Sequence, residues 1–266
     1  MSAKDLILRP ISTDDARRTI KRLHYSGSIV ISSQVNIGVF YGGVLEGALQ
    51  FGPPMDKRKA AGLVRGSEWH HFIELNRMAF SEAPPRNSES RALAVSFRLL
   101  RKHAPQLKWV LSFADAAQCG DGTIYRASGF VLTGIKENTQ IVEFPGGERI
   151  TRKRLTDTTQ ALSIDIAALA AKYGVRRTGA STMREWEAVG ARPIPGYQFR
   201  YVRFLDPAWQ DRLTVPVIPF DKIPAACKMY RGVPVAMCGS PKENSGDQLL
   251  SGGASPTLPL STPENT

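Results

Sequence analysis

Strand-like and helical patterns alternate along the first 135 residues, and their order sets the class of fold. Apolar runs bounded by Gly and Pro predict strands, and apolar residues at helical spacing predict helices. Their order, β–α–β–β–(α)–β–α–β–α–β, is typical of an α/β fold with a mixed sheet. Strands are expected over 6–9, 35–41, 44–51, 72–80, 109–113 and 130–133, and helices from 12 to about 24, around 59–64, over 89–103 and up to 128.

Two of these segments can be described more closely. Gly42-Gly43 stands between two apolar runs, which is a strong signal for a hairpin. The segment 72–80 reads Phe-Ile-Glu-Leu-Asn-Arg-Met-Ala-Phe and is predicted as a central strand. Strict alternation along it puts Arg77 on the face of Leu75 and puts Glu74 on the opposite face.

The rest of the chain is predicted to hold an insertion and a tail. Residues 136–160 are polar and basic, which suggests a surface excursion. Two further helices and a strand are expected at 162–173, 182–189 and 197–205. We therefore expect one α/β domain over 1–225, with 136–195 as a helical and loop insertion. In the C-terminal segment 226–266, Gly, Ser, Pro and Thr predominate from about residue 239, so disorder is expected there.

The charge of the chain favours a nucleic-acid partner. It carries 35 Lys and Arg against 24 Asp and Glu, a net charge of +11 at pH 7. A single basic cluster is most simply a solvated surface, but five of them together favour binding to phosphate backbones. The clusters lie at 17–22, 57–59, 101–102, 149–154 and 176–177.

Other features restrict the cellular setting. The sequence has no apolar run of membrane-spanning length, and the apolar run near its N-terminus is too short for a signal peptide. The three cysteines have no CxxC spacing, which argues against a disulfide framework and a zinc knuckle. We therefore expect a soluble intracellular protein, with no membrane partner.

The segment Tyr125-Arg-Ala-Ser-Gly-Phe130 follows a strand, a loop and a short helix. In this setting it resembles the N-acetyltransferase (GNAT) superfamily. The resemblance implies a mixed, mostly antiparallel central sheet flanked by helices, and it makes acetyl-CoA one candidate donor. The superfamily holds the donor pyrophosphate in a glycine-containing loop. Here the aligned stretch 86–91 has Glu89 and Arg91 in place of the glycines.

A more specific resemblance covers about residues 4–205. It rests on the segment 72–80, Pro-Arg-Asn-Ser-Glu-Ser-Arg, Phe-Ala-Asp, Cys-Gly-Asp-Gly-Thr-Ile-Tyr-Arg-Ala-Ser-Gly-Phe and the earlier His24-Tyr25-Ser26. Together these resemble the Mom family of phage DNA-modification proteins. The resemblance implies an enzyme of the host cytoplasm that converts adenine in double-stranded DNA to N6-(carbamoylmethyl)adenine. That product blocks host restriction enzymes.

Three residues are candidates for catalysis. Asp115 ends a strand and could act as a base or metal ligand, with an Asx-turn as the alternative. Arg77 lies among apolar residues of a core strand and could hold donor or phosphate; alternatively it pairs with Glu74 or Glu46. Tyr125 occupies the position of a general-acid tyrosine in many members of the GNAT superfamily, and the alternative is a packed aromatic residue.

Further candidates lie near the acceptor and the donor. Tyr25 could stack on a flipped adenine and contribute to catalysis. His24, Tyr25 and Asp115 together could hold an iron, although no spacing motif marks the set. Three residues near a helix start could contact the donor: Arg86, Ser88 and Ser90. Two other groups are not assigned a site, since His70 and His71 are expected to point to opposite sides of a strand and Cys119 is taken as structural.

Two other functions are compatible with the sequence. The first is an ordinary GNAT acetyltransferase that acts on a protein or a small amine. The second is a basic DNA-binding protein without catalytic activity. The residues leave the donor, the target sequence and the oligomeric state open, with a dimer among the options. For the modifying enzyme we expect the target base to be flipped out of the duplex.

Overall fold

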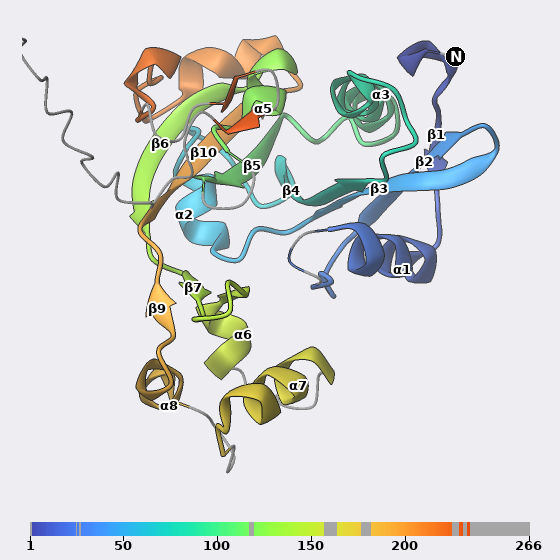
Figure 1. Ribbon diagram of the computed structural model, residues 1–266. Coiled ribbons are helices and arrows are strands. Elements are labelled where there is room, and N and C mark those ends of the chain that lie inside the picture. The colour runs from blue at the N-terminus through green and yellow to red at the C-terminus, as the bar shows by residue number, and fades with distance from the viewer. Residues whose placement is uncertain are drawn as a thin grey trace, which may run out of the picture.

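The computed structural model describes residues 2–24, 26, 28–116, 120–156, 164–176, 182–224, 229–230 and 233–234. A seven-stranded sheet runs through its centre in the order β1-β2-β3-β4-β5-β10-β6 (Figure 1). Its strands are β1 (Ile7–Pro10), β2 (Val35–Tyr41), β3 (Val44–Gly52), β4 (Phe72–Phe80), β5 (Trp109–Asp115), β10 (Gly196–Phe204) and β6 (Val131–Asn138).

Short strands and helices complete the described chain. The short strands are β7 (Ile141–Glu143), β8 (Arg149–Thr151), β9 (Arg192–Pro193), β11 (Met229–Tyr230) and β12 (Val233–Pro234). The α-helices are α1 (Thr13–Leu23), α2 (Lys57–Ala61), α3 (Ser88–His103), α5 (Thr123–Ala127), α6 (Arg152–Thr156), α7 (Ile164–Tyr173) and α8 (Met183–Ala188). The 3-10 helices are η1 (Ala3–Asp5), η2 (Pro207–Arg212) and η3 (Phe220–Lys222).

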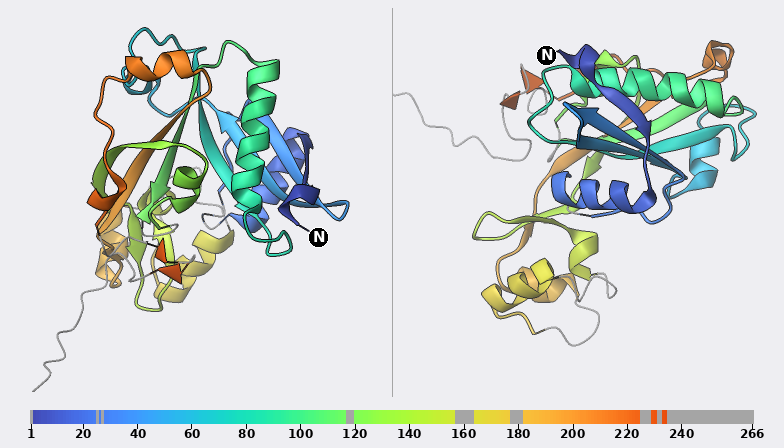
Figure 2. Two further views of the ribbon diagram at one scale, coloured as in Figure 1. Left: turned by 90° about the horizontal axis from the view of Figure 1, so that it is seen from above. Right: turned by 90° about the vertical axis from the view of Figure 1, so that its right-hand side faces the viewer.

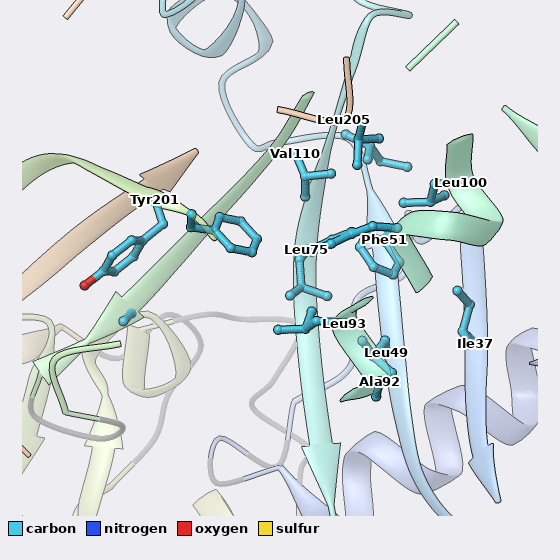
Figure 3. Packing of buried hydrophobic residues seen from close by; sticks show 14 of the residues in the cluster. Ile37, Leu49, Phe51, Leu75, Ala92, Leu93, Leu100, Val110, Tyr201 and Leu205 are labelled. Carbon is cyan, nitrogen blue, oxygen red and sulfur yellow. The ribbon is translucent and has the colours of Figure 1, made fainter. Parts of the chain in front are cut away.

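Helices cover both faces of the large sheet, as Figure 1 shows. On one face, α3 and α5 pack over the main hydrophobic cluster, in which Phe51 and Leu75 of the sheet lie near Leu93 and Leu100 of α3 (Figure 3). On the opposite face, α1 covers β3 and β4 while α2 covers the beginnings of β4 and β5. The expected mixed, mostly antiparallel sheet flanked by helices is confirmed.

The two central strands β4 and β5 form the one parallel pair among the described strands of this sheet. They are paired at three positions, Phe72 with Trp109, Ile73 with Val110 and Glu74 with Leu111. Beyond these positions the strands spread apart toward their carboxyl ends (Figure 2, left). The sheet therefore opens between its two central strands, at the end where α3 begins.

A β-bulge changes which residues of β4 share a face. Gln50 of β3 lies opposite Arg77, and the next residue, Phe51, lies opposite Leu75, so Asn76 has no partner in the ladder. An extra residue of this kind shifts the alternation by one position. The expected alternation was therefore wrong: Leu75 packs under α3, while Arg77 lies with Glu74 on the opposite face.

The insertion contains a hydrophobic cluster of its own. The strands β8, β7 and β9 form a small sheet in that order, and α6, α7 and α8 pack beside it. Leu155, Ile166 and Trp186 are fully buried in this cluster. The expectation of a polar surface excursion over 136–160 was thus wrong, since β6 continues to Asn138 and Val142 is also buried. The insertion lies on the same side of the large sheet as α1 (Figure 2, right).

Two further expectations concern membrane-spanning helices and the C-terminal tail. In the described ranges, no helix combines the length and apolar character that crossing a membrane requires. The tail from about residue 239 lies outside the described residues, as does most of 226–266.

Candidate active site

A cleft of about 1740 Å³ occupies the opening between β4 and β5. Its walls come from β4 and β5, the loop before α3, α5, α2, and the neighbouring parts of β6 and β10. Six of the candidate site residues predicted from the sequence line it: His24, Arg77, Arg86, Ser90, Asp115 and Tyr125. The separation of two parallel strands therefore brings together residues that lie far apart in the sequence.

Arg77 lies at the centre of one wall. Its Nη1 donates to the backbone oxygen of Asn76 at 2.7 Å, and its Nε donates to the backbone oxygen of Ser28 at 3.5 Å. Two ionisable side chains near Arg77, those of Glu74 and His24, have pKa values shifted from their ordinary ones. Burial raises the pKa of Glu74, against the opposing effects of Asn76 and the Arg77 charge. Burial and then Arg77 lower the pKa of His24 to about 4, so His24 is neutral at pH 7.

The tautomer of His24 follows from its neighbours. The backbone N–H of Ser26 donates to His24 Nδ1 at 3.1 Å, so the proton of the neutral ring is assigned to Nε2. The backbone oxygen of Ser26 in turn accepts from Arg154 Nη1 at 3.2 Å. Because Arg154 belongs to α6, the insertion contacts the loop that positions His24.

Asp115 lies on the other wall, at the end of β5. Asn138 Nδ2 donates to Asp115 Oδ2 at 2.8 Å. Asn138 is the last residue of β6, and β10 lies between β5 and β6. The residue of β10 opposite Asn138 is Gly196 and the residue opposite Asp115 is Gln198, so the contact runs diagonally across β10. No sequence pattern drew attention to Asn138, because the two residues become neighbours through the strand order.

Tyr125 reaches the same cleft from α5. Its hydroxyl donates to the backbone oxygen of Phe113 at 3.5 Å, and its ring lies 5.2 Å from those of Phe130 and Tyr201. The ring is therefore packed, as the structural alternative expected, while the residue also lines the cleft. Both descriptions apply to this tyrosine.

The three residues expected to contact the donor, Arg86, Ser88 and Ser90, lie at or just before the start of α3. They differ in how far they are exposed to the cleft. Arg86 is exposed and Ser90 lines the cleft, where its hydroxyl donates to the backbone oxygen of Asn87 at 3.1 Å. Ser88 is buried, and its hydroxyl donates to the backbone oxygen of Pro85 at 2.5 Å. Ser88 thus stabilises the turn, which Asn87 passes with a positive φ of 71°.

The iron site stays a prediction. Tyr25, one of its three expected ligands, lies outside the described residues, as does Cys119. Within the described part of the chain, no three His, Cys, Asp or Glu side chains are grouped as metal ligands would be. His70 and His71 precede β4 and their rings lie 4.2 Å apart, so the expectation that they point to opposite sides of a strand was wrong.

The sheet order, its single described parallel pair and the cleft between those two strands define the mixed α/β class that the resemblance to the GNAT superfamily implied. Within this class, the chain belongs to the Mom protein family, whose model matches residues 5–222.

A curated relative is the methylcarbamoylase Mom of Escherichia phage Mu. The two are 38% identical over 138 residues, which are 52% of this chain and 57% of the relative. The chain therefore matches a little over half of the relative's length.

Solved structures with a similar outline are acetyltransferases. A GNAT superfamily phosphinothricin acetyltransferase from Sinorhizobium meliloti has a TM-score of 0.44 at 13% identity, covering 81% of this chain and 97% of that one. The ribosomal-protein-S18-alanine N-acetyltransferase from Escherichia coli has a TM-score of 0.41 at 11% identity, covering 77% and 97%. These similarities concern the outline of the fold alone.

Proposed function

We propose that this protein is a transferase that modifies phage DNA, converting adenine in the duplex to N6-(carbamoylmethyl)adenine. The observation that carries the proposal is the cleft between β4 and β5, in a chain of the Mom family, lined by His24, Arg77, Asp115 and Tyr125. The name of the relative from phage Mu supports the same type of transfer. The modified DNA would then resist host restriction enzymes in the host cytoplasm.

The product determines what the cleft must supply. A carbamoylmethyl group joins adenine N6 through a CH2, whereas ordinary acyl transfer would join N6 to a carbonyl carbon. The N6 lone pair is delocalised into the ring, so N6 is a weak nucleophile and needs a base. The amino group gives up one proton to that base as the new bond forms. Asp115 is suited to accept that proton, because the amide of Asn138 holds its carboxylate at the rim of the cleft.

The other residues are assigned to the donor. The Arg77 guanidinium can hold a carbonyl or carboxylate oxygen of the donor, because it is fixed by two backbone oxygens. Tyr125 can give a proton to a leaving group. His24, neutral at pH 7, can donate a hydrogen bond through Nε2 without adding charge. In this step the bond between the donor's CH2 and its leaving group breaks as the N6–CH2 bond forms, the N6 proton goes to Asp115, and the leaving group takes a proton from Tyr125.

Acetyl-CoA fits this site poorly. A donor pyrophosphate would need to lie at the start of α3, where Glu89 lines the cleft. A carboxylate in the first turn of a helix repels an anion that the helix N-terminus would otherwise attract. Arg86 and Ser90 remain available there for a different donor.

The cations around the cleft support a DNA substrate. Besides Arg77, five cationic side chains line it, from α2, the loop before α3, α5, β6 and β10: Lys59, Arg86, Arg126, Lys136 and Arg200. Such a ring can hold phosphates on either side of a base that has left the stack. A duplex that carries 2-aminopurine should accordingly become more fluorescent when the protein binds.

Nucleoside analysis tests the proposal. The protein is expressed in a bacterium, plasmid DNA is digested to nucleosides, and these are analysed by mass spectrometry. A deoxyadenosine heavier by one carbamoylmethyl group is expected, and empty-vector DNA should lack it. Unmodified DNA from cells that contain the folded protein, together with newly acetylated protein or amines, would favour the ordinary acetyltransferase instead.

A further inference from the structure

Phe113 of β5 is an exposed aromatic residue in the middle of a central strand. Its side chain is 36% exposed, although the residues on both sides of it, Ser112 and Ala114, are fully buried. Leu111, two positions earlier on the same face, is covered by α2 and its neighbours. That cover ends before Phe113, so the ring forms part of the cleft surface. A core strand usually buries such a ring, because burying a large apolar side chain stabilises the fold.

The residues around Phe113 form two rows across three strands. Arg200 of β10 lies opposite Phe113, and Gly134 of β6 lies opposite Arg200. One step along, Asp115 lies opposite Gln198, which in turn lies opposite Lys136. Directly opposed residues share a face of the sheet, and all six line the cleft.

In the first row, the side chain of Arg200 bonds to β6 and not to Phe113 of β5. Arg200 is bent toward β6, where its Nη2 donates to the backbone oxygen of Thr133 at 2.7 Å and its Nε donates to Thr133 Oγ1 at 3.1 Å. Gly134 makes room for this, since a Cβ there would lie 3.2 Å from Arg200 Nη2. The guanidinium is therefore held on the β6 side of Arg200, away from Phe113 on β5.

The second row carries hydrogen-bonding groups. Gln198 is exposed, and its amide offers a donor and an acceptor, the pair that matches an adenine edge. Asp115 lies beside it and follows Phe113 by two residues, which is about 7 Å along a strand. A purine ring that lies on Phe113 can therefore place its amino group at the row that contains Asp115, the proposed general base.

We propose that Phe113 and Gln198 form the adenine subsite of the cleft, with Phe113 as the stacking platform and Gln198 reading the edge of the base. The inference rests on the proposed function and identifies which residues recognise its substrate. Stacking on an aromatic ring tolerates any base, so Phe113 supplies affinity. The amide of Gln198 selects adenine, and Lys136 and Arg200 favour the adjoining phosphates.

Binding of single strands tests the subsite without the donor, because a single strand presents its base already unpaired. The probes are short oligothymidylates that carry one central adenine or one central purine lacking the amino group. The wild-type protein should bind the adenine strand more tightly. We expect this preference of the wild type to be about tenfold, and Gln198→Ala should abolish it. Phe113→Leu should weaken binding of both strands by about tenfold.

Matched variants control for general effects. Trp69 is 71% exposed and lies outside the cleft, and Gln210 is an exposed glutamine of η2. Trp69→Leu and Gln210→Ala should bind both probes as the wild-type protein does. Wild-type binding by Phe113→Leu, or an equal loss in Trp69→Leu, would overturn the subsite. Phe113→Leu retains apolar volume, and circular dichroism verifies that it is folded.

Nucleoside analysis of the same variants separates this inference from the proposed function. If the wild-type chain modifies DNA and both subsite variants do so equally well, the subsite is wrong and the function stands. If the wild-type chain distinguishes the two probes but yields no modified adenine, the subsite stands and the proposed chemistry is wrong.

Discussion

Asn138 donates its side-chain amide to Asp115 across an intervening strand, at 2.8 Å. Asn138 lies opposite Gly196 of β10 and Asp115 lies opposite Gln198, so the contact crosses β10 diagonally. A carboxylate that acts as a base must be held in one orientation, and this amide supplies that restraint. The relationship gives Asn138 a positioning role in the proposed reaction.

Asn138→Ala should lower the yield of modified adenine by about tenfold, because a hydrogen bond to a charged group is removed. Asn138→Asp should lower it further, since a second carboxylate would repel the first. Nucleoside mass spectrometry measures the yield. The pH profile of the purified enzyme should also shift for both variants, whereas an unchanged profile would mean that Asn138 has only a structural role.

Arg77→Gln should raise the pKa of His24, because the guanidinium charge contributes to lowering it. Burial is the larger cause, so the pKa should remain below its ordinary value of 6.5. Titration of the His24 ring protons by NMR measures the change. Arg22→Gln, a change of an exposed arginine two positions from His24 in sequence, is the control. An equal shift in both variants would contradict a specific effect of Arg77.

The stability of the protein should decline between pH 6.5 and pH 4 because of His24. Its folded-state pKa of about 4 lies below the ordinary 6.5, so in this range the unfolded chain binds more protons. The contribution is complete above pH 6.5 and is lost as the pH falls through the folded pKa. It amounts to about 3 kcal/mol at most. Denaturant unfolding of the wild type and His24→Gln should show a smaller pH dependence for the variant.

Arg154→Ala should weaken the link between the insertion and the loop after α1. Removing Nη1 deprives the Ser26 backbone oxygen of a charged donor, so amide exchange around Ser28 should become faster. Modified adenine should decrease while the unfolding midpoint changes little. Lys153→Ala, which alters the exposed neighbour on α6, is the control. Equal exchange in the two variants would show that the Arg154 contact is not what orders the loop.

Local sequence signals predicted the elements of the sheet but not their contacts. Gly42 and Gly43 identified the β2–β3 hairpin, and Ser12 caps α1 by accepting from the backbone N–H of Asp15 at 3.0 Å. No Gly or Pro in β4 marks the bulge at Asn76 in the sequence. The shared face of Glu74 and Arg77 could therefore not be predicted.

The candidate site was predictable residue by residue, but its assembly was not. Asp115 and Arg77 stood out because charged groups are rare within core strands. Phe113 resembled an ordinary core residue, since its exposure depends on where α2 ends and where β4 leaves β5. In the insertion, apolar residues as far apart as Val142 and Trp186 form the cluster, and no short window contains both.

In the proposed function, the cleft between β4 and β5 modifies adenine through Asp115. Asp115→Asn keeps the size of the side chain and removes the proton acceptor, while Asp211→Asn makes the same change at an exposed residue of η2. Nucleoside mass spectrometry of DNA from cells that express each variant compares them directly. We expect wild-type levels of N6-(carbamoylmethyl)adenine with Asp211→Asn and at least a hundredfold less with Asp115→Asn, about the rate factor that a general base contributes. Equal modification by both variants would contradict it.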